Sequence, residues 1–565
     1  MADGLANTAL EQVASLAELA ANQRGVSLVG SDLRLFENRV GVAASDIDAN
    51  TQISPFMLGR TYELALAPTA RRKTGAHLTP EAVARNLLAM MAPPAAGDTV
   101  LDPSVGGAAF LIAAADQLVA AGAAPLAVLS QLAGVDIDAG AVAIAEVALA
   151  IWGLDHQVEV RALSGIHHGD GLLDPLPRAD RVVGNPPFLN QLRSSSAHSA
   201  DRRVALREKW GDLVGAYTDD AWLFLAAGLD AARDEGQLAM VQPVSVLAAR
   251  HGESVRRHIG ERASLTGLWL ARDRMFDAAV QVCGVVLDRG SDGHDHVERR
   301  VGADFAPAPR RSSQPTAQQW GSAAATLLAV PDVDLVGRTS ATIADRATAT
   351  AGFRDQFYGF VPFVSESSSD DVDSSHAKLI TVGMIDVMHL GWGERNYKFA
   401  KQSFTRPTID LGALAANDPK LNDWVAARRR PKVVMATQTR VVEVWVDIDG
   451  VVVPSTPVLS IEPHSENPEE LWLLAAALSA PAVSAHLLAV NFGTAMSLNA
   501  MKVAARDVLQ LPLPTETGAW REAADLLRDA PHELADFAAL MGRAYGVQDP
   551  ALVAWWLGRL PNRTE

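Results

Sequence analysis

The segment Arg181–Asn190, RVVGNPPFLN, decides how this chain folds. The valines before Gly184 are typical of the end of a short buried β-strand, which the glycine breaks. The two prolines that follow lack a backbone N–H and fix φ, so they predict a stiff, extended turn at the carboxyl end of the strand. Such a turn presents the amide of Asn185, bare carbonyl oxygens and the flat ring of Phe188. The stretch alone fits two interpretations equally: a site that accepts hydrogen bonds from an amino group, or a plain tight turn.

Short apolar runs alternate with amphipathic helices around this segment. The predicted strands are 99–102, 132–136, 158–163, 180–184, 237–242, 265–271 and 280–288. This alternation is typical of an α/β fold, a Rossmann-like domain with a mainly parallel seven-stranded sheet. The last two strands are joined by a segment too short for a full helix. We therefore expect them to form an antiparallel pair at the end of the sheet.

Composition limits the class of protein. A chain of 565 residues predicts two or three domains. The net charge of −17 argues mildly against a nucleic-acid partner, but a whole-chain average does not exclude a basic groove. One cysteine, Cys283, excludes an internal disulfide and a cysteine-based zinc site, and no metal site is predicted. No apolar run is long enough for a bilayer, and the acidic N-terminus lacks the features of a signal peptide, so a cytoplasmic protein without a membrane is expected.

The second half of the chain has a different texture. The stretches PAPRRSSQP (307–315) and SESSSDDVDSS (365–375) predict loops or linkers. Farther on, Asp449-Gly450 stands between two β-branched runs within 440–461, which predicts a β-hairpin. From about residue 467 the pattern is helical again.

Polar residues stand at the carboxyl ends of the first four predicted strands, where ligands bind in open α/β sheets. Asp102 ends the first strand and is followed by a loop containing Gly106; Asp136 ends the second. Asp170 follows the third, and Asn185 the fourth. Each aspartate alone is more often a solvated strand end or a helix N-cap, but three aspartates and the NPPF turn at four successive strand ends favour a binding site. Neither G-x-x-x-x-G-K-[ST] nor an intact G-x-G-x-x-G is present, which disfavours phosphate-centred chemistry.

In order and spacing, these residues resemble the motifs of the S-adenosylmethionine-dependent DNA methyltransferases of the N6-adenine type, in the gamma motif order. TGAHLTP (74–80) resembles that family's TGxxYTP segment, and DPSVGGAAFL (102–111) resembles its DPacGtGgFL loop. GVDID (134–138) resembles the acidic ribose-binding strand end, and Gly169-Asp170 the adenine-binding position. The resemblance covers about residues 55 to 290 and implies a class I methyltransferase domain.

The resemblance implies S-adenosyl-L-methionine as the cofactor and a role for each matching residue. Thr79 would contact the methionine part of the cofactor, and Asp102 and Gly106 would line its loop. Asp136 would bind the ribose hydroxyls, and Asp170 the adenine amino group.

The catalytic residues implied by the same resemblance are those of the turn: Asn185, Pro186, Pro187 and Phe188. Asn185 and the Pro186 carbonyl would accept hydrogen bonds from the N6 amino group of an adenine, which directs the nitrogen lone pair toward the methyl group. Phe188 would stack on that base, which must be flipped out of the duplex to reach the pocket.

Two positions depart from the family pattern. Ala108 replaces the second glycine of the cofactor loop, and Leu78 replaces the tyrosine before Thr79. An alanine fits this loop if its φ is negative. We expect the departures to affect cofactor affinity rather than to abolish activity.

Basic residues mixed with aromatic ones suit contacts with DNA phosphates and bases. The expected DNA-binding residues are Arg193, Lys398, Lys401, Arg428, Arg429, Arg430 and Arg440. The expected division is an N-terminal helical segment (1–70), the methyltransferase domain (71–290), a linker with a target-recognition domain (291–515) and a C-terminal helical segment (516–565).

The expected function is methylation of N6 of adenine in double-stranded DNA at specific sites. Two alternatives stay open: a methyltransferase for RNA or a protein amide, and a catalytically weak DNA-binding subunit of a modification or defence complex. No PD-(D/E)xK nuclease pattern is found, and the short N-terminal region leaves little room for a nuclease domain, so a modification-only enzyme is expected. The sequence leaves open the recognition site, the choice between monomer and dimer, and the presence of a partner restriction or defence subunit.

Overall fold

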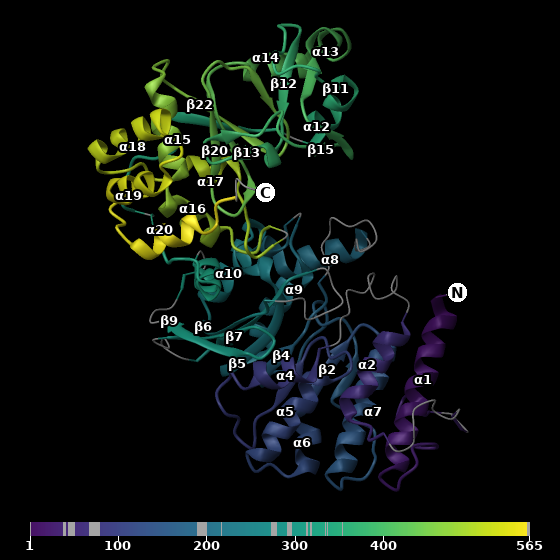
Figure 1. Ribbon diagram of the computed structural model, residues 1–565. Helices are drawn as coiled ribbons and strands as arrows, with labels where there is room; N and C mark the ends of the chain where they lie inside the picture. Colours follow the sequence, from purple (N-terminus) through teal and green to yellow (C-terminus); the bar gives the residue numbers. More distant parts are fainter. Residues whose placement is uncertain are drawn as a thin grey trace. The chain divides into compact units, whose positions relative to one another are not determined.

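The structure is a computed structural model that separates into two compact units, Met1–Trp320 and Gly321–Glu565 (Figure 1). We call them unit 1 and unit 2. The structure describes residues 2–37, 41–42, 51–66, 79–188, 200–215, 217–272, 280–290, 296–311, 315–316, 319–333, 335, 337–352, 354–495 and 497–561.

Unit 1 is built on a nine-stranded sheet. In spatial order its strands are β3 (Ile166–His168), β2 (Leu132–Asp136), β1 (Val100–Asp102), β4 (Ala179–Gly184), β5 (Ala232–Pro243), β7 (Val282–Asp288), β6 (Ser264–Leu270), β8 (Val297–Val301) and β9 (Ala306–Arg311). The first five strands are parallel, and β7 is antiparallel to both β5 and β6. The mainly parallel α/β sheet and its antiparallel pair are confirmed.

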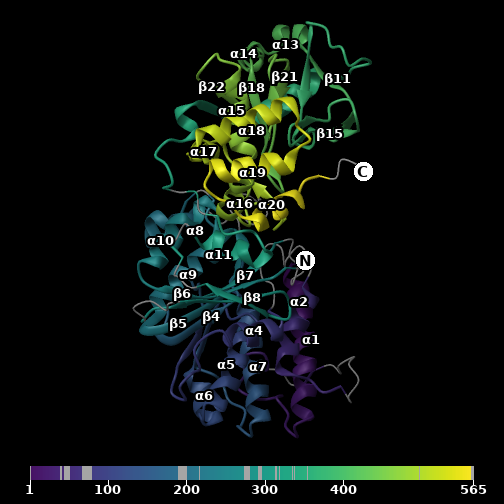
Figure 2. The ribbon, with the colours of Figure 1, turned by 60° about the vertical axis from the view of Figure 1, so that its left-hand side comes forward.

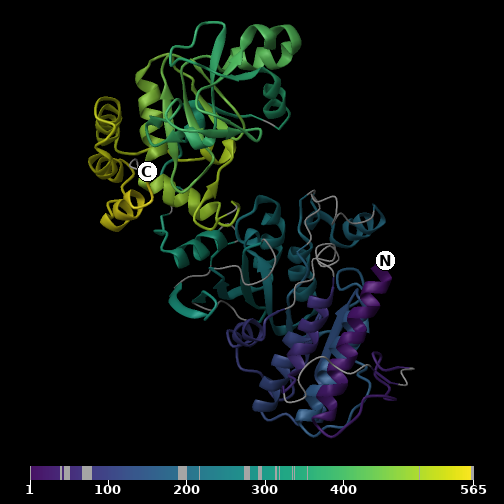
Figure 3. The ribbon, with the colours of Figure 1, turned by 45° about the vertical axis from the view of Figure 1, so that its right-hand side comes forward.

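Two layers of helices cover this sheet, and alternate residues of the strands face opposite layers. Val183 packs in the core shared with one layer, whereas its neighbour Val182 lies against Gly228 of the other. The first layer contains α4 (Glu81–Leu88), α5 (Ala109–Ala120), α6 (Pro125–Gln131) and α7 (Ala139–Asp155), with α1 (Ala2–Asn22) and α2 (Pro55–Ala65) beside α7 (Figure 2, Figure 3). The second contains α9 (Asp220–Ala231) and α10 (Glu253–Gly260); α8 (Ala200–Trp210) precedes them in the chain.

The predicted third strand is wrong: residues 158–163 form no strand, and β3 begins at Ile166. The carboxylate of Glu146 accepts a hydrogen bond from the backbone N–H of Leu163 at 3.1 Å, which takes a donor that a sheet would use. Close approach to β2 begins at Gly165, where a Cβ would lie 2.1 Å from the carbonyl oxygen of Leu132. Pairing therefore starts only where glycine lets the two backbones meet.

The predicted number of strands, seven, is also wrong, because β8 and β9 extend the sheet. The stretch expected to be a linker, 307–315, forms most of β9. Two prolines are compatible with a strand here because β9 is the last strand of the sheet, and an edge strand needs fewer backbone donors.

Unit 2 contains two four-stranded sheets. One orders β10 (Ala347–Ala351), β22 (Val458–Pro463), β18 (Lys432–Ala436) and β20 (Glu443–Asp447). The other orders β11 (Val364–Glu366), β17 (Pro407–Asp410), β12 (His376–Ile380) and β21 (Val452–Pro454). Three two-stranded sheets pair β13 (Ile385–Asp386) with β14 (His389–Leu390), β15 (Tyr397–Phe399) with β16 (Gln402–Phe404), and β19 (Gln438–Thr439) with β23 (Met501–Lys502).

The helices of unit 2 cover these sheets. The first are α11 (Trp320–Ala325), which begins at the unit boundary, α12 (Arg354–Phe360), α13 (Leu411–Asn417) and α14 (Pro419–Arg428). The C-terminal group, drawn toward yellow in Figure 2, is α15 (Glu469–Ser479), α16 (Pro481–Val490), α17 (Ala505–Leu509), α18 (Thr517–Asp529), α19 (Leu534–Ala544) and α20 (Pro550–Leu557). Among the described residues no single helix is long and apolar enough to cross a membrane; α15 and α16, bent by 57°, meet that test only as a pair.

The hairpin predicted around Asp449-Gly450 is wrong. β20 and β21 flank this turn but belong to different sheets: β20 pairs with β18, and β21 with β12. Gly450 does adopt a positive φ of 67°. The turn is held by the side chain of Asp447, which accepts hydrogen bonds from the backbone N–H groups of Val451 and Val452 at 3.0 and 3.1 Å. The sequence thus predicted the turn at Asp449-Gly450 correctly, but the pairing of the strands on either side depends on residues far away in the sequence.

Candidate active site

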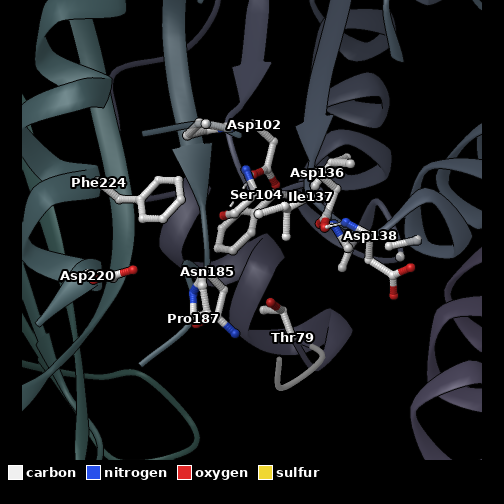
Figure 4. A pocket seen from close by; sticks show the side chains of 18 of the residues that line it. Thr79, Asp102, Ser104, Asp136, Ile137, Asp138, Asn185, Pro187, Asp220 and Phe224 are labelled. Atoms are coloured by element: carbon white, nitrogen blue, oxygen red, sulfur yellow. Dashed lines mark hydrogen bonds between the residues drawn. The ribbon is translucent and has the colours of Figure 1, made fainter. Parts of the chain in front are cut away.

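A cavity of about 320 Å³ lies at the carboxyl ends of β1, β2 and β4 in unit 1 (Figure 4). Most of the residues singled out in the sequence line it: Thr79, Asp102, Gly106, Asp136, Asp170, Asn185 and Pro187. Pro186 and Phe188 are not among its lining residues. Thr79 lies just before α4, whose N-cap is Pro80.

Asp102, at the end of β1, is a buried carboxylate of the cavity, with 2% of its surface exposed. Its Oδ1 accepts a hydrogen bond from the backbone N–H of Ser104 at 3.0 Å. A Cβ at Gly184, on neighbouring β4, would lie 2.8 Å from the same oxygen. Burial raises the pKa of Asp102 to about 7, against the opposing effect of the Ser104 hydrogen bond.

We expect Asp102→Asn to stabilise the protein above neutral pH. Because the folded pKa lies above the ordinary value of 3.8, the folded protein holds a proton that the unfolded chain has lost between about pH 4 and 7. Stability therefore falls as pH rises through this range, by about 2 to 4 kcal/mol at pH 8. Urea unfolding at pH 5 and pH 8 should show a smaller difference between the two pH values for Asp102→Asn than for the wild type; equal differences would contradict the assignment.

Asp136, at the end of β2, holds the loop after β1. Its Oδ2 accepts from the backbone N–H of Gly106, and its Oδ1 from that of Asp138, both at 2.9 Å. Burial raises the pKa of Asp136, while these backbone donors act in the opposite direction. Since each carboxylate oxygen accepts up to two hydrogen bonds, both oxygens retain capacity for hydroxyl groups of a ligand.

Tyr62 and Asp138 are lining residues that the sequence analysis missed. The Tyr62 hydroxyl donates a hydrogen bond to Oδ2 of Asp138 at 2.9 Å, and Oδ1 of Asp138 caps α7 by accepting from Gly140 N at 2.8 Å. Burial and the neighbouring carboxylates raise the pKa of Tyr62. This bond joins α2 to the sheet end across 76 positions of sequence, so local patterning gives no sign of it. The acidic GVDID motif was the available signal for Asp138.

Asp170 forms an ion pair with Arg202 of α8, which also lies 3.5 Å from a carboxylate oxygen of Asp220. All three residues line the cavity. The second oxygen of Asp170 accepts from the backbone N–H of Leu172 at 3.0 Å. Asp219, at the start of α9, caps that helix by accepting a hydrogen bond from Ala221 N. The carboxylate that lines the cavity at the start of α9 is therefore that of Asp220.

The NPPF turn divides between the cavity and the core. Asn185 and Pro187 line the cavity, and the amide oxygen of Asn185 is buried. The ring of Phe188 is half-buried and packs against the hydrophobic core. Phe224 of α9, drawn near Asp102 and Asn185 in Figure 4, does line the cavity, as do the rings of Tyr62 and Phe110. The position of Phe224 in a uniformly apolar helix gave no functional signal.

Ala108 has a φ of 62°, so the condition of a negative φ is not met. It lies in the left-handed region at the N-cap of α5, and its side chain is fully buried. Left-handed backbone costs a non-glycine residue roughly 1 to 2 kcal/mol.

We expect Ala108→Gly to stabilise unit 1 by about 0.5 to 1 kcal/mol, because relief of this strain exceeds the entropy that a glycine adds to the unfolded chain. The matched control is Ala121→Gly at the other end of α5, where φ is −78°. That substitution should destabilise the protein. Chemical denaturation of both variants checks the prediction, and a loss of stability in Ala108→Gly would contradict it.

The predicted DNA-binding residues of unit 2 differ in their surroundings. Lys398, Lys401, Arg429 and Arg440 are exposed. Arg428 and Arg430 both form ion pairs with the buried carboxylate of Glu462, so part of the arginine run serves the fold of unit 2. Arg193 lies outside the described residues.

A carboxylate at the ends of two adjacent parallel strands, a glycine loop between them and an Asn-Pro-Pro turn at the next strand define an S-adenosylmethionine-dependent methyltransferase of class I fold. Residues 54–299 match the family model of the N-6 DNA Methylases. This part of the chain is thus similar to the N6-adenine DNA methylases, a class whose methyl donor is S-adenosylmethionine.

Solved structures extend the fold comparison to the rest of the chain. The type IIL restriction-modification enzyme MmeI, solved in complex with DNA, has a TM-score of 0.60 and 13% identity, covering 97% of this chain and 90% of its own. The type IIG restriction endonuclease BpuSI has a TM-score of 0.41 and 11% identity, covering 99% and 78%. No curated protein sequence matches the chain. The likeness to MmeI shows that the fold of both units occurs in a known protein.

Proposed function

We propose that this protein transfers the methyl group of S-adenosylmethionine to N6 of an adenine rotated out of double-stranded DNA, at the cavity of unit 1. One observation carries the proposal: a single cavity contains the acidic strand ends Asp102, Asp136 and Asp170 together with Asn185 of the turn. Cofactor residues and amino-group acceptor would thus act within one site.

The cavity fits the cofactor by size and by the chemistry of its lining. Its volume of about 320 Å³ falls in the usual range for small-molecule sites, about 300 to 1,000 Å³. Asp136 offers carboxylate oxygens for a ribose diol, Gly106 permits close backbone approach, and Asp170 offers an acceptor for an adenine amino group. When bound, S-adenosylmethionine supplies an electrophilic methyl group. Asp170 and Arg202 form an ion pair in this structure. Asp170 must therefore release Arg202 before it can accept a hydrogen bond from the cofactor.

The turn would orient the target nitrogen. The amide oxygen of Asn185 and the carbonyl of Pro186, which proline leaves without a competing N–H, accept the two N6 hydrogens. The amino group is then held by both hydrogens, so its lone pair points along the line of methyl transfer. The burial of the amide oxygen supports this role, because a hydrogen bond made away from water orients more strongly.

Phe188 and Phe224 are the two candidates for stacking on the base. Phe224 lines the cavity, whereas Phe188 packs against the core and would stack only if it turned away from that packing. We therefore assign the stacking role to Phe224 first and retain Phe188 as the second candidate.

DNA contacts are proposed for unit 2. MmeI, whose fold is similar along both units, was solved in complex with DNA. The exposed cations Lys398, Lys401, Arg429 and Arg440 are the residues of unit 2 that we assign to this role. Arg428 and Arg430 are assigned to the fold, because both form ion pairs with the buried carboxylate of Glu462.

The test is to incubate the purified protein with radiolabelled S-adenosylmethionine and, separately, genomic DNA, total RNA or cell protein, with Asn185→Ala alongside. Label should enter DNA as N6-methyladenine and be lost in the variant. Label confined to RNA or protein would overturn the proposal in favour of an amide or RNA methyltransferase. Cofactor binding without label in any substrate would favour a DNA-binding subunit.

A further inference from the structure

A second cavity, of about 350 Å³, lies within unit 2 and shares no lining residue with the methyltransferase site. We call it the arginine pocket. Its polar lining residues are Asp386, Arg395, Gln438, Arg440, Glu443 and Arg559. They come from segments far apart in the sequence: β13, the residues before β15, the β19–β20 region and the residues after α20. The fold of unit 2 therefore gathers three guanidinium groups that no local motif would place together.

Two of the three arginines are fixed by neighbouring groups. Arg395 donates from Nε to the Tyr397 hydroxyl at 3.2 Å. Arg559 donates to the carbonyl oxygen of Asn499 at 2.7 Å and lies 4.9 Å from the Trp555 ring centroid. The hydrogen bond with Tyr397 and the charges of Asp386 and Glu394 raise the pKa of Arg395. Both guanidinium groups are therefore held in place.

The third arginine is the one best placed to reach a ligand. The Arg440 side chain is exposed, and no described residue forms a hydrogen bond or ion pair with its guanidinium. Only its backbone is engaged, since its carbonyl oxygen accepts from Nε of Arg559 at 3.4 Å. Arg440 connects β19 to β20, so its backbone is anchored on both sides by strands. The backbone of Arg440 is thus fixed, while its guanidinium is available to a ligand.

The lining of the pocket contains more positive than negative charge. Burial and the positive charge of Arg440 both lower the pKa of Arg559. Glu443 is 8% exposed, and burial raises its pKa to about 8, so it offers little negative charge at neutral pH. Asp386 is the other acidic lining residue, and its charge acts on Arg395. A ligand that brings hydrogen-bond acceptors would relieve the repulsion between Arg440 and Arg559.

The mixture of groups favours a base edge over a phosphate. A phosphate offers only acceptors, and the carboxylate of Asp386 would not be placed beside it. The edge of a base pair in the major groove offers acceptors and donors side by side. An arginine fork matches the O6 and N7 acceptors of guanine, and glutamine or carboxyl oxygens match the amino groups of adenine or cytosine.

We propose that the arginine pocket reads a base pair of the DNA recognition sequence, with Arg440 donating two hydrogen bonds to O6 and N7 of a guanine. The proposal rests on the proposed function, since it names how the same enzyme selects its DNA. It assigns specificity to a residue of unit 2, separate from the methyl-transfer site of unit 1.

The experiment compares methylation patterns rather than activity alone. Wild type, Arg440→Ala, Arg440→Gln and the control Arg521→Ala, an exposed arginine of α18, are each expressed in a host without adenine methylation. Long-read sequencing then gives the methylated consensus and the occupancy of every site. Arg440→Ala should lose about tenfold or more of the discrimination at one G·C pair, and Arg440→Gln should shift that position toward adenine, whose N6 and N7 suit glutamine.

Each outcome decides the question. An unchanged consensus with uniformly lower occupancy for both Arg440 variants would make Arg440 a phosphate contact and overturn base reading. An unchanged consensus at unchanged occupancy would overturn any role of the pocket in DNA binding. Failure of the wild type to methylate DNA would refute the proposed function instead, and the pocket with it. Melting temperatures equal to that of Arg521→Ala would show that the substitutions act on recognition and not on folding.

Discussion

Asn185→Ala is expected to lower the rate of methyl transfer to DNA by about 100- to 1,000-fold while the dissociation constant for S-adenosylmethionine changes by less than about threefold. The reason is that different residues of the cavity are assigned to the target base and to the cofactor. Asn185 follows β4 and belongs to the turn, whereas the groups assigned to the cofactor follow β1, β2 and β3. Removal of the amide should therefore cost the orientation of the target nitrogen and leave cofactor binding intact.

The measurement separates the two quantities. Cofactor affinity is obtained by calorimetry without DNA, and the single-turnover rate is obtained with a duplex carrying the consensus. Asn185→Asp is the informative second variant: it keeps the shape and one acceptor oxygen but adds a negative charge beside the reacting methyl group. Asn417→Ala, at the exposed end of α13, serves as the matched control. A wild-type rate in Asn185→Ala would remove the turn from the mechanism.

The strand-end residues could be predicted because their pattern is local. A hydrophobic run, a glycine and an acidic residue are neighbours in sequence, and parallel strands bring their carboxyl ends to one edge of the sheet. Asp102, Asp136, Asp170 and Asn185 therefore meet in one cavity as expected.

Other features could not be predicted because they depend on contacts between distant residues. Tyr62 reaches Asp138 across 76 positions, and Arg202 reaches Asp170 across a segment that carried only a general basic pattern. A strand also needs a partner: 158–163 has the alternation of a strand but pairs with no strand, whereas β9 forms at the edge of the sheet despite its two prolines. In the same way, β21 pairs with β12 because of the fold of unit 2, and the turn before β21 does not determine this pairing.

The buried pair Lys432–Asp447 gives the largest expected effect on stability. Lys432 is fully buried, and its ammonium group contacts the carboxylate of Asp447, which is 1% exposed. Its remaining polar neighbour is the Arg430 carbonyl oxygen at 3.3 Å. Asp447, in contrast, also accepts from two backbone N–H groups of the turn. The two partners are therefore unequally dependent on each other.

Asp447→Ala should destabilise unit 2 by about 3 to 5 kcal/mol, since it leaves a buried cation without its counter-ion and the turn without its acceptor. Lys432→Met should cost less, because the turn still solvates the carboxylate. Burial lowers the pKa of Lys432, and loss of Asp447 should lower it further. Below the pKa of an exposed lysine the unfolded chain then binds more protons than the folded protein. The stability of Asp447→Ala should therefore rise with pH.

Hydrogen exchange of peptides from β18 and β20, measured at pH 7 and pH 9, localises the effect to this sheet. Arg528→Ala, which removes an exposed ion pair of α18, is the control and should change stability by less than about 1 kcal/mol. Equal losses for Asp447→Ala and Lys432→Met would mean that the ion pair itself, and not the turn that Asp447 holds, sets the stability of this sheet. Since Arg440 lies between β19 and β20, the same exchange experiment also reports whether the base-reading residue is fixed by the sheet or moves with its edge.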